Sequence, residues 1–196
     1  AAVLAPIGPV GTWSDAELAA AWQVNVVAVA TLMNAFHQAS VQAESALVLT
    51  ISSGAGKRPI AGWAMYCAAK AAIDMLSLTY AQEQAQSPRV QVYSLSPGVV
   101  DTAMQATIRA SAKEDFPNVD YFKELKSEGK LSTPQSVAEH IFHFVNAQKE
   151  PNDTYHFLKK IDDINYLNDA KNKSAIDSLQ LIIDNSSNDT IKGYFY

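Results

Sequence analysis

The chain has 196 residues, 48% hydrophobic and 18% charged, which fits one ordinary globular domain and excludes a disordered or fibrous protein. Its net charge of −5 argues against binding nucleic acid through a general basic surface. No uninterrupted apolar run is long enough to span a bilayer, so no membrane partner is expected. The single cysteine, Cys67, excludes an intrachain disulfide and indicates a reducing, cytoplasmic compartment.

Composition changes along the chain. Residues 1–50 hold three charged residues and thirteen alanines, whereas residues 151–196 hold twelve charged residues, six asparagines and two alanines. We interpret the polar end as an appended segment. Three origins stay open for it: a natural extension, a fusion-derived segment and a joined gene model.

The first predicted helix follows a loop over residues 1–13 and runs from 14 to about 38. Ser14 and Glu17 have the spacing of a capping box, which places the start of the helix. Residues 19–35 are apolar nearly all round, so we expect this helix to be buried on more than one side.

Two strands and a second helix come next. Residues 45–52 (SALVLTIS) form a short apolar run, typical of a strand buried on both faces in a parallel sheet. A second Ala-rich helix is predicted over 64–86 and another strand over 90–95. This alternation indicates βαβ units with right-handed crossovers, and therefore an α/β fold.

The remaining elements are shorter. Helices are predicted near 101–111 and 119–128. Thr133 and Pro134 have the residue types of a helix cap and first position, so a helix is expected from there to about 147. Residues 154–158 predict one last strand.

The stretch from residue 52 to 70 carries the chemistry. Tyr66 and Lys70 lie four apart, so on a helix they share a face. An ammonium beside a phenol favours the phenolate, and we therefore expect Lys70 to lower the pKa of Tyr66. A serine at the end of the preceding strand can bond the oxygen that Tyr66 protonates, and Asn25 can fix a water or the lysine. Such a set suits reduction of a carbonyl.

Taken alone, Tyr66 and Lys70 fit an exposed i,i+4 pair better than a functional one. Their context favours a functional set. Ser53 ends a predicted buried strand and stands thirteen residues before Tyr66, and a Pro-Gly turn follows the next strand.

With these residues the chain resembles the short-chain dehydrogenase/reductase family over about residues 1–162. The resemblance rests on Asn25, Ser53, the YxxxK pair and the segment SPGVVDT at 96–102. Within the family, residues 62–70 and 96–105, with LKSEGKL at 125–131, look most like sepiapterin reductase and the bacterial benzil reductases.

The resemblance implies a fold and a set of catalytic roles. The fold is a Rossmann-like, doubly wound parallel sheet. Tyr66 is the implied general acid, and Lys70 lowers its pKa and binds the nicotinamide ribose. Ser53 orients the substrate carbonyl, and Asn25 completes a proton relay through water.

Cofactor and substrate contacts are implied in the same way. The subgroup uses NADPH, and its substrate here is expected to be a ketone, a diketone or a pterin-like carbonyl. Besides Tyr66 and Lys70, the expected cofactor contacts are Pro97, Gly98, Val100 and Thr102. The expected pocket wall is formed by Ser53, Trp63 and Met104.

The chain also departs from the family pattern. The family begins with a strand and a T-G-x-x-x-G-x-G turn that binds the cofactor pyrophosphate. None of the eight glycines here makes that spacing, and no discriminating residue for the adenosine ribose is present. We therefore expect residues 1–162 to be the C-terminal two-thirds of such a domain, incomplete at the N-terminus. Residues 163–196 are the Asn-, Asp- and Lys-rich extension.

Other reactive side chains fit structural roles. His140 and His143 lie three apart on a predicted helix and His156 follows them. Because this set lacks a clear carboxylate partner for a metal, helix-face positions are the favoured interpretation of the histidines on that helix, and no metal is expected. Cys67 is read as a small buried side chain, and no G-x-S-x-G elbow supports hydrolase chemistry. Lys57 and Arg58 fit a solvated loop as well as a phosphate contact.

Two functional hypotheses follow. The first is an NADPH-dependent carbonyl reductase that forms a homodimer through helices 14–38 and 64–86, although those helices could also be core only. The second is an inactive fragment or pseudoenzyme of the same family that only dimerises.

Overall fold

A computed structural model describes residues 2–87, 89–147 and 156–157. Every predicted helix and strand is present, with ends within three residues of the predicted ones. In chain order the elements are α1 (Asp15–Trp22), the π turn η1 (Gln23–Val27), α2 (Ala28–Ser40), β1 (Ala46–Ile51), the 3₁₀ turn η2 (Gly54–Gly56), α3 (Ala64–Glu83), β2 (Val90–Leu95), α4 (Ala103–Ala110), α5 (Val119–Ser127), α6 (Pro134–Ala147) and β3 (His156–Phe157).

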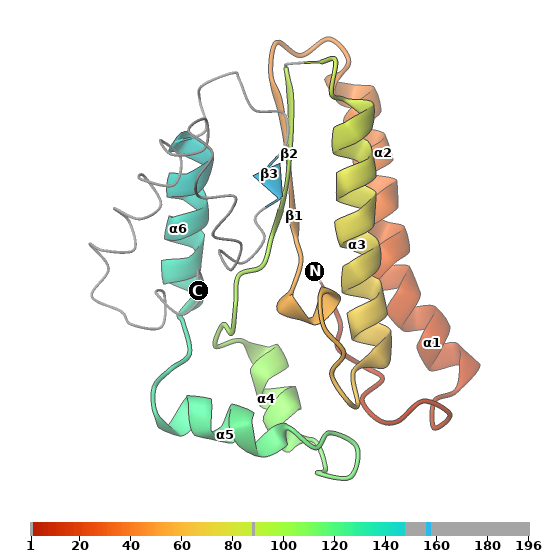
Figure 1. Cartoon of the computed structure of the whole chain (residues 1–196), viewed down its shortest axis with the longest axis vertical. Helices are drawn as coiled ribbons and strands as arrows, with labels where there is room; N and C mark the ends of the chain where they lie inside the picture. Colours follow the sequence, from red (N-terminus) through yellow and green to blue (C-terminus); the bar gives the residue numbers. More distant parts are fainter. Residues whose placement is uncertain (1, 88, 148–155, 158–196) are drawn as a thin grey trace.

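The strands form a parallel sheet in the order β1-β2-β3, which confirms the predicted α/β class. The β1–β2 register runs from Ala46 opposite Val90 to Ile51 opposite Leu95. Figure 1 shows α6 on one side of the strands and α1, α2 and α3 on the other, as in a doubly wound fold.

Alternate side chains of the strands fill the two layers between sheet and helices. Val48 and Val92 point toward the long helices, where Met33 and Tyr80 pack on them. On the opposite face the ring of Tyr93 meets Phe144 of α6 edge-on, with 5.1 Å between ring centroids. Both faces of the sheet are therefore apolar, which explains the near-continuous hydrophobic runs of its strands.

The first long helix begins as predicted and contains a π turn. Ser14 Oγ accepts a hydrogen bond from the Glu17 amide, and the Glu17 carboxylate accepts one from the Ser14 amide, so the capping box is complete. The π turn η1 places Asn25 in the interior, 2% exposed. Its side-chain amide bonds both backbone groups of Val3, at 2.9 Å from Oδ1 to the amide and 2.7 Å from Nδ2 to the carbonyl.

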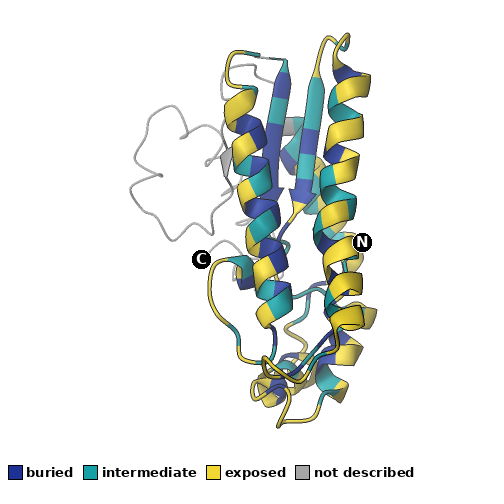
Figure 2. Ribbon diagram, turned by 90° about the vertical axis from the view of Figure 1, so that its right-hand side faces the viewer, coloured by how far each residue is buried: buried dark blue, intermediate teal, exposed yellow. Residues whose placement is uncertain are grey.

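The expectation that this helix is buried on more than one side is wrong for the single chain. Trp22, Val27 and Leu32 are exposed, Leu32 by 69%. Packing partners within the chain lie on one side only, and Figure 2 shows exposed positions running along the outer faces of the two long helices. By length and composition alone, Asp15–Ser40 is apolar enough to cross a membrane, a criterion that helices in globular cores also meet.

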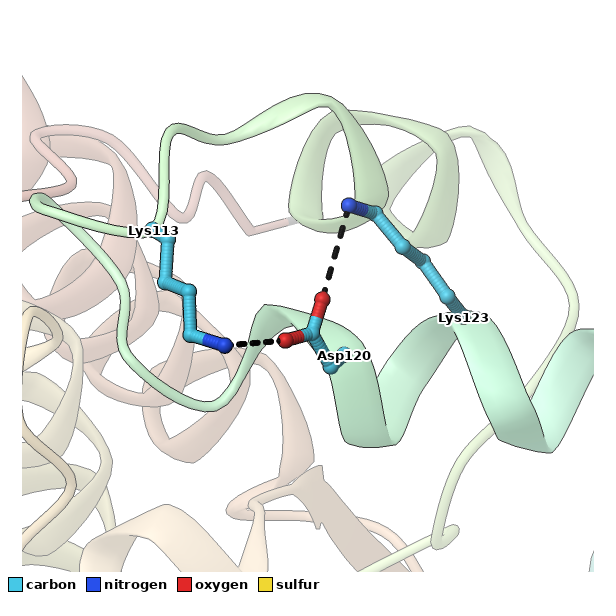
Figure 3. Close-up of polar contacts among 3 residues, drawn as sticks. All are labelled: Lys113, Asp120 and Lys123. Atoms are coloured by element: carbon cyan, nitrogen blue, oxygen red, sulfur yellow. Dashed lines mark hydrogen bonds and ion pairs between the residues drawn. The ribbon is translucent and has the colours of Figure 1, made fainter.

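A layer of α4 and α5 covers the carboxyl end of the sheet (Figure 1). In Figure 3, Asp120 of α5 lies between Lys113 and Lys123, at 2.5 Å and 3.7 Å. The hydrogen bond from Lys113 lowers the pKa of the Asp120 carboxyl. All three side chains are exposed, so water screens these pairs and they contribute little to stability.

Three loop segments meet at Gly62. Gly62 has φ +84° and accepts a hydrogen bond from the Gly8 amide at 2.9 Å. A Cβ at Gly62 would collide with the backbone oxygen of Asp115. This contact holds the loop ahead of Trp63, whose ring stacks on Phe116 at 4.6 Å.

Gly62→Ala should destabilise the fold by more than the cost of its backbone conformation. Gly129→Ala is the matched control, because Gly129 also has a positive φ (+67°) but nothing lies within 4 Å of its Cβ position. We expect about 1–2 kcal/mol of lost unfolding free energy for the control and a larger loss for Gly62→Ala, measured by urea unfolding. Equal losses would show that the Asp115 contact is unimportant.

Asn25→Ala should cost about 1–3 kcal/mol of unfolding free energy, since it removes two part-buried hydrogen bonds to the backbone of Val3. Asn34→Ala, at an exposed position of α2, should change stability by less than about 0.5 kcal/mol. Urea unfolding measures both variants, and a loss no larger for Asn25→Ala than for Asn34→Ala would contradict this account.

Candidate active site

The predicted site residues follow the carboxyl ends of β1 and β2. Parallel strands place these ends at the same edge of the sheet, where ligands of open α/β folds bind. Ser53 comes directly after β1 and caps the η2 turn, with its Oγ accepting from the Ala55 amide at 3.2 Å. Tyr66 and Lys70 lie on the first turns of α3.

Three of the predicted catalytic residues are brought together. The Ser53 side chain lies near the Tyr66 phenol, where it lowers the pKa of that phenol. Lys70 Nζ lies 5.5 Å from the centroid of the Tyr66 ring and donates to the Ile51 carbonyl oxygen at 2.9 Å. The lysine therefore links α3 to the end of β1 and sits beside the phenol.

The expected lowering of the Tyr66 pKa is wrong for this chain. Burial of the phenol raises its pKa, and this effect outweighs the hydrogen bond with Ser53, which lowers it. Burial also lowers the pKa of Lys70. The phenol consequently keeps its proton at neutral pH, which is the form that a proton donor requires.

Asn25 lies close to this cluster but its side chain is engaged elsewhere. The η1 turn packs against α3, while the Asn25 amide bonds the backbone of Val3. The role of Asn25 in a proton relay stays a prediction.

The segment after β2 is held in place by backbone pairing. Val100 pairs with Ser132 in a parallel bridge, and the Asp101 amide donates to the Ser132 carbonyl at 2.8 Å. Gly98 adopts φ +72°, and the Thr102 side chain makes no capping hydrogen bond to α4. The segment is thus ordered beside the catalytic strand ends. Cofactor contacts by Pro97, Gly98, Val100 and Thr102 stay predictions.

Trp63 is more deeply buried than a pocket wall requires. The residue is 5% exposed and packs between Tyr66 and Phe116. Met104 packs partly buried against the same cluster. Trp63 thus packs edge-on against the ring of Tyr66 within the core. The roles of Trp63 and Met104 in a substrate pocket stay predictions.

The remaining predictions concern the cysteine, the histidines and the C-terminal extension. Cys67 is half-buried. Within the described ranges, no three or more His, Cys, Asp and Glu side chains cluster as metal ligands would. The side chain of His156 and the extension over 163–196 lie outside the described residues.

Sequence reasoning missed one buried polar pair next to the site. Asp74 follows Lys70 by one helical turn, and its Oδ1 accepts from Ser94 Oγ at 2.7 Å. Continuing the i,i+4 series from Tyr66 through Lys70 would have found Asp74. Ser94, a polar residue in an apolar strand, was the second signal.

Known proteins are similar to this chain. The family model for short chain dehydrogenases matches residues 1–113. Benzil reductase ((S)-benzoin forming) of Bacillus cereus is 37% identical over 153 residues, covering 77% of this chain and 61% of the relative. Mouse sepiapterin reductase is 36% identical over 121 residues, covering 59% of this chain and 44% of the relative. The chain thus spans about three fifths or less of the length of these relatives.

A solved structure agrees with the sequence relatives. A short chain dehydrogenase from Shigella flexneri complexed with NADP superposes with a TM-score of 0.55 at 27% identity, covering 68% of this chain and 49% of that one. The matched family model spans more than half of the chain and includes Ser53, Tyr66 and Lys70. The chain belongs to the short-chain dehydrogenase/reductase family.

Proposed function

We propose that the chain carries the catalytic part of an NADPH-dependent carbonyl reductase. The observation that supports this most directly is the close approach of the Ser53 side chain and the Lys70 ammonium to the Tyr66 phenol. A protonated phenol, a second hydroxyl and a cation at one sheet edge can together bind and protonate a carbonyl oxygen.

The proposed substrate is a ketone, a diketone or a pterin-like carbonyl. This proposal draws on relatives that are named as reductases of benzil and of sepiapterin. Behind Tyr66 the rings of Trp63 and Phe116 are buried, so the partly buried Met104 and Phe122 that pack on them are the apolar side chains offered to a bulky substrate.

The donor set at the site fits a nicotinamide cofactor. Among the described residues, Lys70 gives one of its three N–H groups to Ile51, which leaves two for ribose hydroxyls. The hydroxyl of Thr102 and the open backbone at Gly98 lie in the segment that follows β2. When bound, the cofactor supplies a hydride to the carbonyl carbon.

The side chains complete the reduction. The Ser53 hydroxyl donates a hydrogen bond to the carbonyl oxygen and orients it. Tyr66 Oη gives its proton to that oxygen as the carbon is reduced, so the product is an alcohol. The phenolate left on Tyr66 is stabilised by the Lys70 ammonium until a proton returns from solvent, by way of the relay that includes Asn25.

We also propose a homodimer formed through α1–α2 and α3. Apolar side chains lie exposed on both helices, among them Leu32 on α2 and Met75 on α3, exposed by 69% and 63%. An exposed apolar surface along Asp15–Ser40 is typical of an interaction site. In a symmetric dimer a second copy of the chain would bury it with the same apolar surface. The cytoplasmic location remains a prediction.

Tyr66→Phe should abolish reduction of a diketone, with a fall in kcat of about 100-fold or more, and should spare NADPH binding. NADPH fluorescence titration measures binding, and consumption of NADPH measures turnover. Tyr121→Phe, at an exposed position of α5, is the matched control and should behave as wild type.

Each alternative gives a distinct result in this experiment. Unchanged turnover in Tyr66→Phe would refute the assigned proton donor. Absence of saturable NADPH binding to the wild-type chain would refute the reductase proposal for this chain and favour the inactive, dimerising alternative.

Leu32→Glu should convert the dimer to a monomer, because it buries a charge in an apolar interface. Sedimentation velocity measures the oligomeric state. Gln38→Glu, at an exposed polar position of the same helix, is the control. A Leu32→Glu variant that sediments as the wild type does would rule out this interface.

A further inference from the structure

Two side chains of the charged residue types are buried in the part of the chain that the structure describes. Lys70 is 4% exposed and Asp74 is 6% exposed; the other buried polar residues there are uncharged. The two lie four residues apart on α3, so they share a helix face. Two opposite charges buried together one turn apart point to a shared role.

The carboxylate of Asp74 is held by the sheet. Its Oδ1 accepts from Ser94 Oγ of β2 at 2.7 Å. Its Oδ2 is buried and makes no hydrogen bond to any described residue. One carboxylate oxygen is therefore fixed by β2, and the other makes no direct hydrogen bond to the described residues.

The turn that carries Ser53 packs on the same stretch of helix. A Cβ at Gly56 would lie 2.9 Å from the Lys70 carbonyl carbon and 3.1 Å from Asp74 Oδ2. The turn that follows Ser53 therefore lies against α3 at both the Lys70 backbone and the Asp74 carboxylate. A displacement of Asp74 would be transmitted to both Lys70 and this turn.

Physical chemistry explains what the carboxylate can do there. Burial disfavours the ammonium and lowers the pKa of Lys70, whereas the charge of Asp74 raises it. An isolated buried charge is costly, and removal of one partner of a buried pair leaves the other uncompensated. The Lys70 ammonium must stay charged if it is to stabilise a phenolate at Tyr66.

We propose that Asp74 is a positioning residue for Lys70: its carboxylate, fixed by Ser94, balances the charge of the buried ammonium, which the Ile51 carbonyl holds beside Tyr66. The functional part of this inference rests on the proposed reductase. Asp74 itself is not placed in contact with substrate or cofactor, and it acts through Lys70.

A double-mutant cycle on the full chain tests the pairing. The variants are Asp74→Asn, Lys70→Met and the double variant, with Glu83→Gln as a control that removes one exposed negative charge from the same helix. In urea unfolding at pH 7, each single variant should lose stability. The double variant should regain most of that loss, because no unpaired charge remains.

A structural role without charge pairing gives a different result. The losses of the two single variants would then add in the double variant. Additive losses, or a double variant that does not fold, would overturn the proposal, even if Asp74→Asn alone is unfolded.

The titration of Lys70 supplies the readout that a merely structural role would not move. Lysine labelled with ¹³C is followed by NMR, and Lys70→Met identifies the signal. In Asp74→Asn the titration midpoint of the Lys70 ammonium should fall by about one pH unit or more. In Glu83→Gln that midpoint should not change. An unchanged midpoint in a folded Asp74→Asn variant would overturn the proposal.

Few other groups can produce that shift. On α3, the ionisable side chains that share a face with Lys70 are Tyr66, Cys67 and Asp74. The residues of β1, η1 and η2 include no ionisable side chain, and on β2 the phenol of Tyr93 points to the opposite face of the sheet. Exposed charges flank the packed elements at Lys57 after η2 and at Asp15 and Glu17 on α1.

Neither measurement requires cofactor or turnover. A chain that fails to bind NADPH would refute the proposed function and still give a result for the charge pair. If the chain is active, Asp74→Asn should lower kcat more than it changes KM, and Glu83→Gln should change neither.

Discussion

The site depends on how closely the turn after β1 approaches α3. A Cβ at Gly56 would lie 2.9 Å from the Lys70 carbonyl carbon and 3.0 Å from the Ala71 amide nitrogen, so a residue without a side chain is needed for so close an approach. This approach lets Ser53 reach Tyr66 and lets Lys70 reach the Ile51 carbonyl. A layer of side chains at this point would separate the strand end from the helix and disperse the three groups.

The interface between the sheet and α3 is divided along its length. Toward the amino ends of the strands it is apolar, with Val90 and Val92 against Tyr80 and Ala81. Toward the carboxyl ends it is polar: Thr50 bonds Ser77 at 2.8 Å, and Ser94 bonds Asp74. The apolar half supplies the burial that stabilises the fold, and the polar half fixes the geometry that the chemistry needs.

Much of this arrangement could be predicted, because hydrophobic periodicity and i,i+4 spacing are local properties. They gave the helices, the parallel strands and the nearness of Tyr66 to Lys70. Burial could not be predicted in the same way, since it depends on which elements cover which face. For that reason the outer face of α2 is open where burial was expected, and desolvation reverses the expected pKa direction of Tyr66. The π turn at Asn25 changes the hydrogen-bond register without changing the pattern of residue types.

The bonds between Asn25 and Val3 imitate the pairing of one strand with another. The side-chain amide of Asn25 supplies one donor and one acceptor, which pair with the backbone carbonyl and amide of Val3. The anchor therefore constrains the path of the chain at position 3 but not its side chain. Among relatives that keep this asparagine, substitution at the partner position should be broad, with proline alone excluded for want of an amide hydrogen.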